Sequence, residues 1–263
     1  MNSQVEVPPV SIFNKDGRAR LLLVCEHASN FIPAQFNNLQ LSDEVLHSHA
    51  ALDIGANDLA QAISRLLDAP LVASAVSRLV YDCNRAFGAT GAIPEKSEVY
   101  QIPGNQNLDD AEVRERFEKY YLPFETAISN RLAEFAAPPL FVTIHSFTPV
   151  YHGETRKVDI GIISDQDSRL SDQMVQHGRQ QTKLCVEPNQ PYGPGDGVTH
   201  TLDLHGNSKD LLNTMIEVKN DLLGSAEQRR EIAMTLAKMI SASAEYFGYT
   251  IPLKNDHSAS CLN

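Results

Sequence analysis

Two histidines in the sequence each follow an apolar run of the length expected for a buried strand. His27 comes just after RLLLVC, and His145 directly follows LFVTI. An imidazole at the end of a strand can point into a crevice, where it serves as a metal ligand or as an acid–base group. For either residue alone, a histidine hydrogen-bonded in a turn is the competing interpretation. Two of them at separate strand ends, with carboxylates nearby in the sequence, favour a metal site.

A third ligand is needed to complete such a site, and a carboxylate would give the two-histidine, one-carboxylate set that leaves room for water. We expect Asp53, in HSHAALDIGAND, to supply it, although helix capping or a surface charge would also explain this residue. His47, His49 and Glu26 are rival ligands. Glu26 is the direct neighbour of His27, so on a regular strand it would point to the opposite face. A bend at this position would remove that objection.

Glu217 lies inside an apolar run, in MIEVKND. A carboxylate is costly to bury without a partner, and burial raises its pKa. A raised pKa suits a general base that takes a proton from water activated by a metal. The competing interpretation is a structural salt bridge, for which Lys219 and Arg78 are the candidate partners.

The pair Asn84-Arg85 follows another apolar run and is the first candidate for binding a substrate carboxylate. A guanidinium can grip a carboxylate through two hydrogen bonds, and an amide can add a third. Arg85 could instead pack on Phe87 or pair with a surface acid. Arg78 and Arg156 are further candidates for an anion.

Two more histidines, His200 and His205, stand in GVTHTLDLHG. They are candidates for outer metal ligands or substrate contacts, and equally for ordinary loop histidines. Cys25 and Cys83 stand close to the proposed site residues in sequence, but a thiol that ends an apolar run favours inert packing over nucleophilic chemistry. The sequence contains no GxSxG and no glycine-rich phosphate loop, so serine hydrolases and nucleotide-binding proteins lack support.

These residues need a scaffold, and the hydrophobic periodicity predicts one of alternating strands and helices. Such alternation is typical of an α/β fold with a mostly parallel mixed sheet flanked by helices on both faces. Ligands of open sheets bind beyond the carboxyl ends of the strands, where the polar groups fall here. The predicted strands are 20–25, 71–81, 140–144, 158–164 and 214–218, the helices are 46–67, 108–136, 167–181 and 225–246, and the long loops are 87–107 and 188–197.

Length and composition fit one globular domain. The chain has 263 residues, of which 42% are hydrophobic and 21% are charged, values that allow a sizeable core. We expect an irregular lead-in at 1–19, one α/β domain at 20–250 and a tail at 251–263.

The net charge of −11 and the absence of a basic stripe disfavour nucleic acid as a partner. The apolar stretches are far shorter than the ~20 residues that span a bilayer, and the N-terminus has no signal-peptide pattern. The four cysteines, which include Cys185 and Cys261, contain no CxxC pair, so neither a disulfide scaffold nor an all-cysteine zinc site is expected. We expect a cytoplasmic enzyme without nucleic-acid or membrane partners.

The segments CEHASN, DIGANDLA, SRLVYDCNR, TIHSFTP, DIGIIS, GVTHTLDLHG and MIEVKNDL occur in an order that resembles the N-formylglutamate amidohydrolase family. That family is similar to the zinc carboxypeptidase and succinylglutamate desuccinylase architecture. The resemblance implies that His27 and His145 are zinc ligands and that Glu217 is the general base. The resemblance also implies that Asn84 and Arg85 grip the substrate carboxylate.

One position departs from the carboxypeptidase-type pattern, which has a glutamate three residues after its first histidine. Asn30 stands there, so the third ligand must come from elsewhere. The resemblance implies zinc-dependent hydrolysis of the linear amide of a small N-acyl amino acid such as N-formylglutamate, with another divalent metal as an alternative to zinc. The competing functions are a zinc deacylase or carboxypeptidase with a different substrate, and a non-catalytic protein that binds small anions.

Overall fold

The strands at the centre of the molecule bury both of their faces. In strand β2 (Leu21–Cys25) every residue is buried. Leu21 and Leu23 pack into one apolar core, whereas Leu22 and Val24 pack into another, because successive side chains of a strand point to opposite faces. Helices must therefore cover the sheet on both sides.

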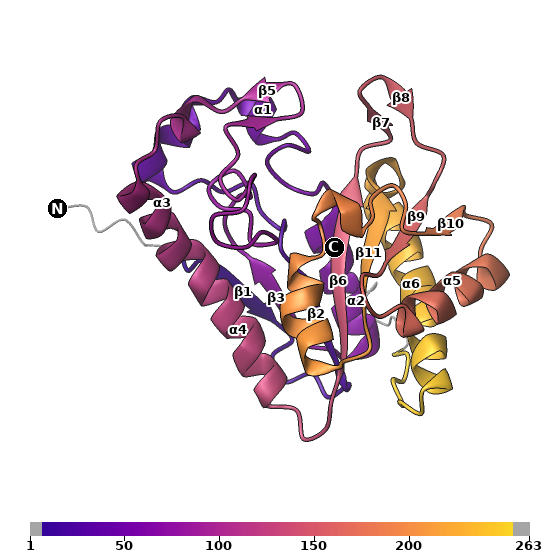
Figure 1. Cartoon of the computed structure of the whole chain (residues 1–263). Helices are drawn as coiled ribbons and strands as arrows, with labels where there is room; N and C mark the ends of the chain where they lie inside the picture. Colours follow the sequence, from indigo (N-terminus) through magenta and orange to yellow (C-terminus); the bar gives the residue numbers. More distant parts are fainter. Residues whose placement is uncertain (1–6, 255–263) are drawn as a thin grey trace, which may run out of the picture.

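The computed structural model describes residues 7–254. Its seven-stranded sheet has the order β1-β3-β2-β6-β11-β9-β10 (Figure 1). Strands β3, β2, β6 and β11 run parallel, β1 and β9 are antiparallel to their neighbours β3 and β11, and β10 runs parallel to β9. The prediction of a mostly parallel mixed sheet is confirmed. The remaining strands of the sheet are β1 (Val10–Phe13), β3 (Leu71–Ser74), β6 (Leu140–Phe147), β9 (Ile160–Ile163), β10 (Val186–Pro188) and β11 (Asn213–Lys219).

Helices lie on both faces of the sheet in a single domain. Helices α2 (Ala56–Leu67), α5 (Arg169–Gln181) and α6 (Ala226–Tyr246) contribute to the core on one face. Helix α4 (Leu122–Ala133) covers the other face and continues α3 (Asp110–Arg116) through a π-helical turn. Figure 1 shows this layering, with α4 on the side of the sheet opposite α6.

The remaining elements of the described structure are short. Two hairpins, β4–β5 and β7–β8, stand at the same end of the molecule (Figure 1). The short elements are α1 (Asp43–Leu46), β4 (Lys96–Ser97), β5 (Tyr100–Gln101), β7 (Val150–Tyr151) and β8 (Glu154–Thr155), the π-helical turns Phe117–Tyr121 and Leu202–Gly206, and the 3-10 turns Ala34–Gln40, Pro103–Asn105, Pro194–Asp196, Asn207–Lys209 and Asn220–Leu223.

Two predicted elements are shorter in the structure. The strand expected at 71–81 ends at Ser74, whose hydroxyl donates to the carbonyl of Val76 at 3.0 Å and turns the chain out of the sheet. The helix expected at 46–67 begins only at Ala56, because Gly55 adopts a positive φ of 80° just before it. The segment before Gly55 is therefore free to approach the sheet edge instead of continuing a helix.

Three other predictions need correction. The strand expected at 140–144 continues to Phe147, because residues 145–147 keep pairing with β11. The lead-in expected to be irregular at 1–19 contains β1, which pairs antiparallel with β3 at the sheet edge. The helix expected at 108–136 is interrupted by the π-helical turn before Pro123, which has no backbone N–H to donate.

Within residues 7–254, no helix is both long and apolar enough to cross a bilayer. Part of the predicted tail packs on the domain, since Ile251 is buried and the backbone N–H of Lys254 donates to the carbonyl of Leu66 at 2.7 Å. Cys25, Cys83 and Cys185 are free thiols, and Cys261 lies outside the described residues.

Candidate metal centre

The site lies where parallel strands β2, β6 and β11 reach their carboxyl ends. His145 on β6 and Glu217 on β11 are register partners, so their side chains emerge next to each other on the face that α4 covers further down. Strand β2 ends at Cys25 and the chain then turns, which brings both Glu26 and His27 to the same place. On a regular strand Glu26 would point away from His27, but this turn lets both side chains reach the site.

Asp53 joins the two histidines. Its Oδ2 atom lies 3.3 Å from Nδ1 of His27 and 2.8 Å from Nδ1 of His145. The segment carrying Asp53 is held in place because its backbone N–H donates to the carbonyl of His27 at 3.0 Å. Each of the three residues offers a ligand atom, and these atoms all lie within 4.8 Å of one another.

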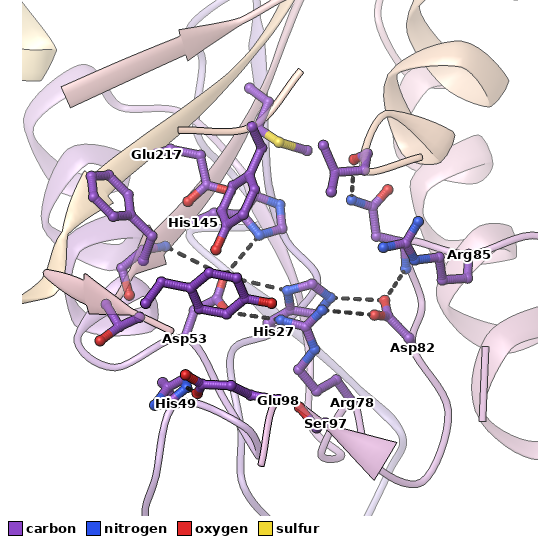
Figure 2. A pocket seen from close by; sticks show the side chains of 18 residues that line it. His27, His49, Asp53, Arg78, Asp82, Arg85, Ser97, Glu98, His145 and Glu217 are labelled. Carbon is purple, nitrogen blue, oxygen red and sulfur yellow. Dashed lines mark hydrogen bonds and ion pairs between the residues drawn. The ribbon is translucent and has the colours of Figure 1, made fainter. Parts of the chain in front are cut away.

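The other nitrogen of each imidazole faces a second carboxylate. Nε2 of His27 lies 2.8 Å from Oδ1 of Asp82, and Nε2 of His145 lies 3.0 Å from Oε2 of Glu26 in an ion-pair contact without hydrogen-bond geometry. A carboxylate at Nε2 favours the tautomer with its proton there, which leaves the Nδ1 lone pair for a cation. Figure 2 shows His27 between Asp53 and Asp82.

The four acidic residues that are buried in the described part of the chain all belong to this site. Glu26 is 1% exposed, Asp53 6%, Asp82 3% and Glu217 5%. Arg78 is the guanidinium that ion-pairs with them, donating to Asp53 at 3.2 Å and to Asp82 at 2.9 Å. Negative charge at such depth is stable only when it is compensated.

The pKa shifts follow this arrangement. Burial alone would raise the pKa of both Asp53 and Asp82. The neighbouring His27 and His145 instead hold the pKa of Asp53 well below its usual range. His27 and Arg78 do the same for the pKa of Asp82. Burial likewise opposes the charged form of His145, yet the neighbouring Glu26 and Asp53 carboxylates raise its pKa. The site is therefore a network of buried carboxylates, imidazoles and one guanidinium that compensate each other's charge.

These residues fit a divalent metal ion such as zinc. In a tetrahedral zinc site with ligand bonds of 2.0–2.2 Å, neighbouring donor atoms are about 3.3 Å apart. The two separations from Asp53 Oδ2 to the imidazoles, 3.3 and 2.8 Å, are close to that spacing. Nε2 of His145 and both carboxylate oxygens of Glu26 are buried without a hydrogen-bond partner in the described structure. These polar atoms therefore remain available to a bound ion or ligand.

Glu217 is buried beside this set without an ion-pair partner among the described residues. Its Oε2 has no hydrogen-bond partner. The salt bridges considered from sequence do not form, because Lys219 pairs with Asp159 at 2.6 Å and Arg78 pairs elsewhere. Burial, opposed by His145 and reinforced by Asp53, raises the pKa of Glu217 to about 7. A carboxyl group with that pKa exchanges protons readily near neutral pH.

Asn84 and Arg85, the predicted carboxylate grip, bond to residues 196–201, at the end of the long loop 188–197. Asn84 is buried, donates to the carbonyl of Val198 at 2.5 Å and accepts from the backbone N–H of Thr201 at 2.9 Å. Arg85 donates through one NH1 group to the carbonyls of Asp196 and Gly197. The amide of Asn84 is thus engaged at both ends, whereas part of the Arg85 guanidinium stays available at the cavity.

The remaining candidate histidines lie away from the donor set. His200 Nε2 is 2.7 Å from the hydroxyl of Tyr121, and His205 packs against Phe141, so neither lines the cavity that contains the donor set. His47 bonds to its own helix through Nδ1. His49 lines the cavity rim, where it pairs with Glu98 at 2.6 Å.

The cavity has a volume of about 210 Å³. The cavity is lined by the donor set, by Glu217 and by the two arginines Arg78 and Arg85 (Figure 2). The buried thiols contribute no nucleophile, since burial raises the pKa of both Cys25 and Cys83. The lining includes His27, Asp53, Arg78, Asp82, Asn84, Arg85, His145, Phe147, Thr148, Tyr151, Tyr192 and Glu217.

Several residues that line this site had no role in the sequence prediction, and Asp82 and Tyr192 are examples. Asp82 follows an apolar run in VYDCNR, so its place at a sheet edge was visible, but its contact with His27 was not. Tyr192 lies in the Gly- and Pro-rich loop at 188–197, and a single aromatic residue in such a loop carries no signal of its own.

Fold and site together define an α/β protein with a histidine–carboxylate centre at the carboxyl edge of its sheet. A family model described as N-formylglutamate amidohydrolase matches residues 19–223. The chain belongs to the N-formylglutamate amidohydrolase family, whose members hydrolyse amides. The resemblance seen in the sequence is thereby confirmed.

The chain is also similar to solved structures. The gene product Atu2144 from Agrobacterium tumefaciens is 46% identical, with a TM-score of 0.90 over 92% of this chain and 97% of that one. N-formylglutamate amidohydrolase from Ralstonia eutropha JMP134 is 20% identical, with a TM-score of 0.71 over 91% of this chain and 98% of that one, and shows the same fold. Succinylglutamate desuccinylase from Chromobacterium violaceum, at 15% identity, aligns with a TM-score of only 0.42 over 95% of this chain and 68% of that one. No curated protein matches the chain.

Proposed function

We propose that this protein is a zinc-dependent amidohydrolase that cleaves the N-formyl amide of a small amino acid such as N-formylglutamate. The observation that carries the proposal is the donor set of His27, Asp53 and His145 beside the buried, unpaired Glu217. Family membership supports hydrolysis of an amide, and the relative from Ralstonia eutropha is described as an N-formylglutamate amidohydrolase.

Each residue has a role in the proposed reaction. A zinc ion held by His27, Asp53 and His145 would lower the pKa of water to ~7 and polarise the acyl carbonyl. Glu217 accepts a proton from the attacking water and passes it to the leaving amine. The C–N bond breaks as a C–O bond forms, so the products of an N-formyl substrate are formate and the free amino acid.

The network around the donor set keeps its geometry fixed. Asp82 and Glu26 orient the two imidazoles, and Arg78 ties Asp82 to Asp53. Such outer partners raise the basicity of the ligands and hold them in position. Arg85 is the proposed contact for the α-carboxylate. Asn84, with both ends of its amide engaged, acts by positioning the loop that Arg85 also contacts.

The size of the cavity supports a small substrate. Its volume of about 210 Å³ is below the ~300–1,000 Å³ of pockets that take drug-sized ligands. A formyl group carries one carbon and needs little room beside the metal, whereas succinyl groups and peptides need more. The cytoplasmic location stays a prediction from sequence.

The test is metal removal and return combined with a substrate panel. The purified protein is treated with chelator, dialysed, and assayed with formyl, acetyl, succinyl and carbamoyl derivatives of glutamate after adding zinc or another divalent ion. We expect activity to vanish with the metal, to return with zinc, and to be highest for the formyl compound. Full activity after verified metal removal would refute the mechanism.

The panel also separates the competing functions. Preference for a larger acyl group or for a peptide would identify a different deacylase or a carboxypeptidase. A protein that is stabilised by zinc and by acyl amino acids in thermal-shift measurements, yet turns over none of them, would be a binding protein that keeps the fold. The presence of Glu217 at the donor set favours the enzyme.

A further inference from the structure

The hairpin β4–β5 reaches the cavity with its tip. Ser97 pairs with Tyr100, so Glu98 and Val99 form the two-residue turn of the hairpin. Ser97 and Glu98 line the cavity that contains the donor set, whereas Val99 is 66% exposed. The tip of the hairpin therefore lies at the boundary between the cavity and solvent.

A contact across this boundary joins the tip to a second segment. Oε2 of Glu98 lies 2.6 Å from Nε2 of His49, which also lines the cavity (Figure 2). His49 belongs to the segment that leads to Asp53, and the backbone N–H of Asp53 is bonded to the carbonyl of His27. The contact thus ties the hairpin to the segment that carries a proposed metal ligand.

The contact with His49 is what fixes the tip of the hairpin. Every residue of 95–101 is half-buried or exposed, and in the described part of the chain their side chains make no other hydrogen bond or ion pair. The hairpin is anchored at its base, where Ile102 and Tyr100 belong to an apolar cluster. Glu98 has a positive φ of 49°, a conformation uncommon for any residue but glycine. Such a conformation persists only where its surroundings impose it.

The other hairpin at this end of the molecule, β7–β8, is held more firmly (Figure 1). Arg156 directly follows it and donates through NH1 to the carbonyl of Thr148 at 3.3 Å and to the hydroxyl of Tyr192 at 3.0 Å. The backbone N–H of Arg156 donates to the carbonyl of Pro149 at 2.9 Å, and its guanidinium carbon lies 4.6 Å from the centroid of the Tyr151 ring. Several contacts must break before β7–β8 can move, whereas one contact releases the tip of β4–β5.

We propose that the β4–β5 hairpin is a lid over the cavity and that the contact between Glu98 and His49 is the clasp that keeps it closed. A closed lid keeps bulk water away from the reacting carbonyl and holds the substrate beside the donor set, and an open lid admits substrate and releases product. The inference goes beyond the proposed function to the access route, and only its kinetic test rests on that function.

The first experiment is hydrogen exchange on the zinc-loaded protein, because it needs no turnover. We expect the backbone amides of residues 96–102 to exchange about 10-fold faster in Glu98→Ala and in His49→Ala than in the parent protein, since either change removes the charge-assisted hydrogen bond. His49→Ala leaves the turn at Glu98 unaltered, so it separates loss of the clasp from a change in the turn itself. The control is Glu115→Ala, which removes an exposed ion pair with the same separation of 2.6 Å to Lys119 and should leave this exchange unchanged.

The second experiment is a double-mutant cycle on the hydrolysis of N-formylglutamate by the zinc-loaded protein. An open lid must close over each substrate, so the apparent affinity falls with the fraction of protein that is closed. We expect KM to rise about 10-fold in either single variant while kcat changes less than about 3-fold. Because both residues belong to one contact, the double variant should lose no more than either single variant.

Two results would overturn the proposal. Exchange of the hairpin that is equal in the parent protein and in both single variants would show that the contact holds nothing in place. Faster exchange with KM unchanged would show that the hairpin opens without affecting access to the cavity. If no acyl compound is hydrolysed, the proposed function fails, and the exchange measurement still decides whether Glu98 and His49 hold the hairpin closed.

Discussion

Glu217 and His145 are register partners on adjacent parallel strands, β11 and β6. The sheet itself therefore sets their spacing, with both side chains on one face at the carboxyl edge. Asp53 reaches the same point from the turn before α2 and lies 2.8 Å from His145. A rigid sheet thus positions both the proposed base and one proposed ligand, an arrangement that favours precise catalytic geometry.

The first prediction concerns the proposed base. Glu217→Gln keeps the shape of the side chain but cannot accept a proton, so kcat should fall by ~10²–10⁴-fold, the contribution typical of general acid–base catalysis. Zinc content should stay near that of the parent, because Glu217 is not in the proposed ligand set. Turnover by stopped assay and metal content by elemental analysis check both statements.

The control for this substitution is Glu245→Gln, which makes the same chemical change on the exposed surface of α6. It should leave turnover and metal content unaltered. If Glu217→Gln turned over as fast as this control, Glu217 could not be the base.

The second prediction concerns pH. The proposed base works only when unprotonated, and burial raises the pKa of Glu217 to about 7. A bound cation stabilises the carboxylate and lowers that pKa. We therefore expect kcat/KM of the zinc-loaded enzyme to rise with pH through an ionisation at or below pH 7 and then level off. Assays from about pH 5 to pH 9, with metal content measured at each point, test this, and a rate that falls as pH rises through this region would contradict it.

Much of the fold was predictable from sequence because strands buried on both faces leave continuous apolar runs. The run ending at Cys25 is an example, and both of its faces pack against apolar cores. Strand and helix boundaries were less predictable where tertiary contacts decide them. Apolar residues continue past Ser74, yet the chain leaves the sheet there through a side-chain hydrogen bond. β1 is an edge strand, and it depends on a distant partner that local pattern does not reveal.

Part of the site was predictable for the same reason. His145 and Glu217 are positioned by strands, so their convergence follows from the order of the sheet. Asp53 depends on the positive φ of Gly55, and its approach to His27 is a long-range contact. Substrate binding by Asn84 stays a prediction, and the bonds of its side chain to Val198 and Thr201 could not be read from a motif, which gives residue type but not contacts.

The third prediction concerns the carboxylate behind His27. Asp82→Asn replaces the carboxylate that faces Nε2 of His27 with a neutral amide and removes one of the two ion pairs of Arg78. The proposed metal ligands stay in place. Loss of such an outer partner typically weakens metal binding ~10–100-fold. Competition with a chelator of known affinity measures the change, and excess zinc should restore much of the activity. The control is Asp16→Asn, which makes the same chemical change at an exposed residue outside the site. Equal zinc affinity in the two variants would exclude this role for Asp82.

The last prediction concerns the loop that carries Tyr192. Gly161 on β9 faces the backbone of Gln190 so closely that a Cβ atom would overlap its carbonyl oxygen. Gly161→Ala must displace the loop, at a cost of ~1–3 kcal/mol in the free energy of unfolding, as expected for overpacking. The shift moves Tyr192 in the cavity wall, so KM should rise as well. Denaturant unfolding and steady-state kinetics provide the measurements.

The same loop supplies a matched control in Gly195, where a Cβ atom would meet nothing within 4 Å. Gly195→Ala should leave both stability and KM close to those of the parent protein. If the two alanine variants behaved alike, the close approach at Gly161 would not be what holds this loop against the sheet. The position of the loop at the cavity would then depend on Asn84 and Arg85, which bond to its other end.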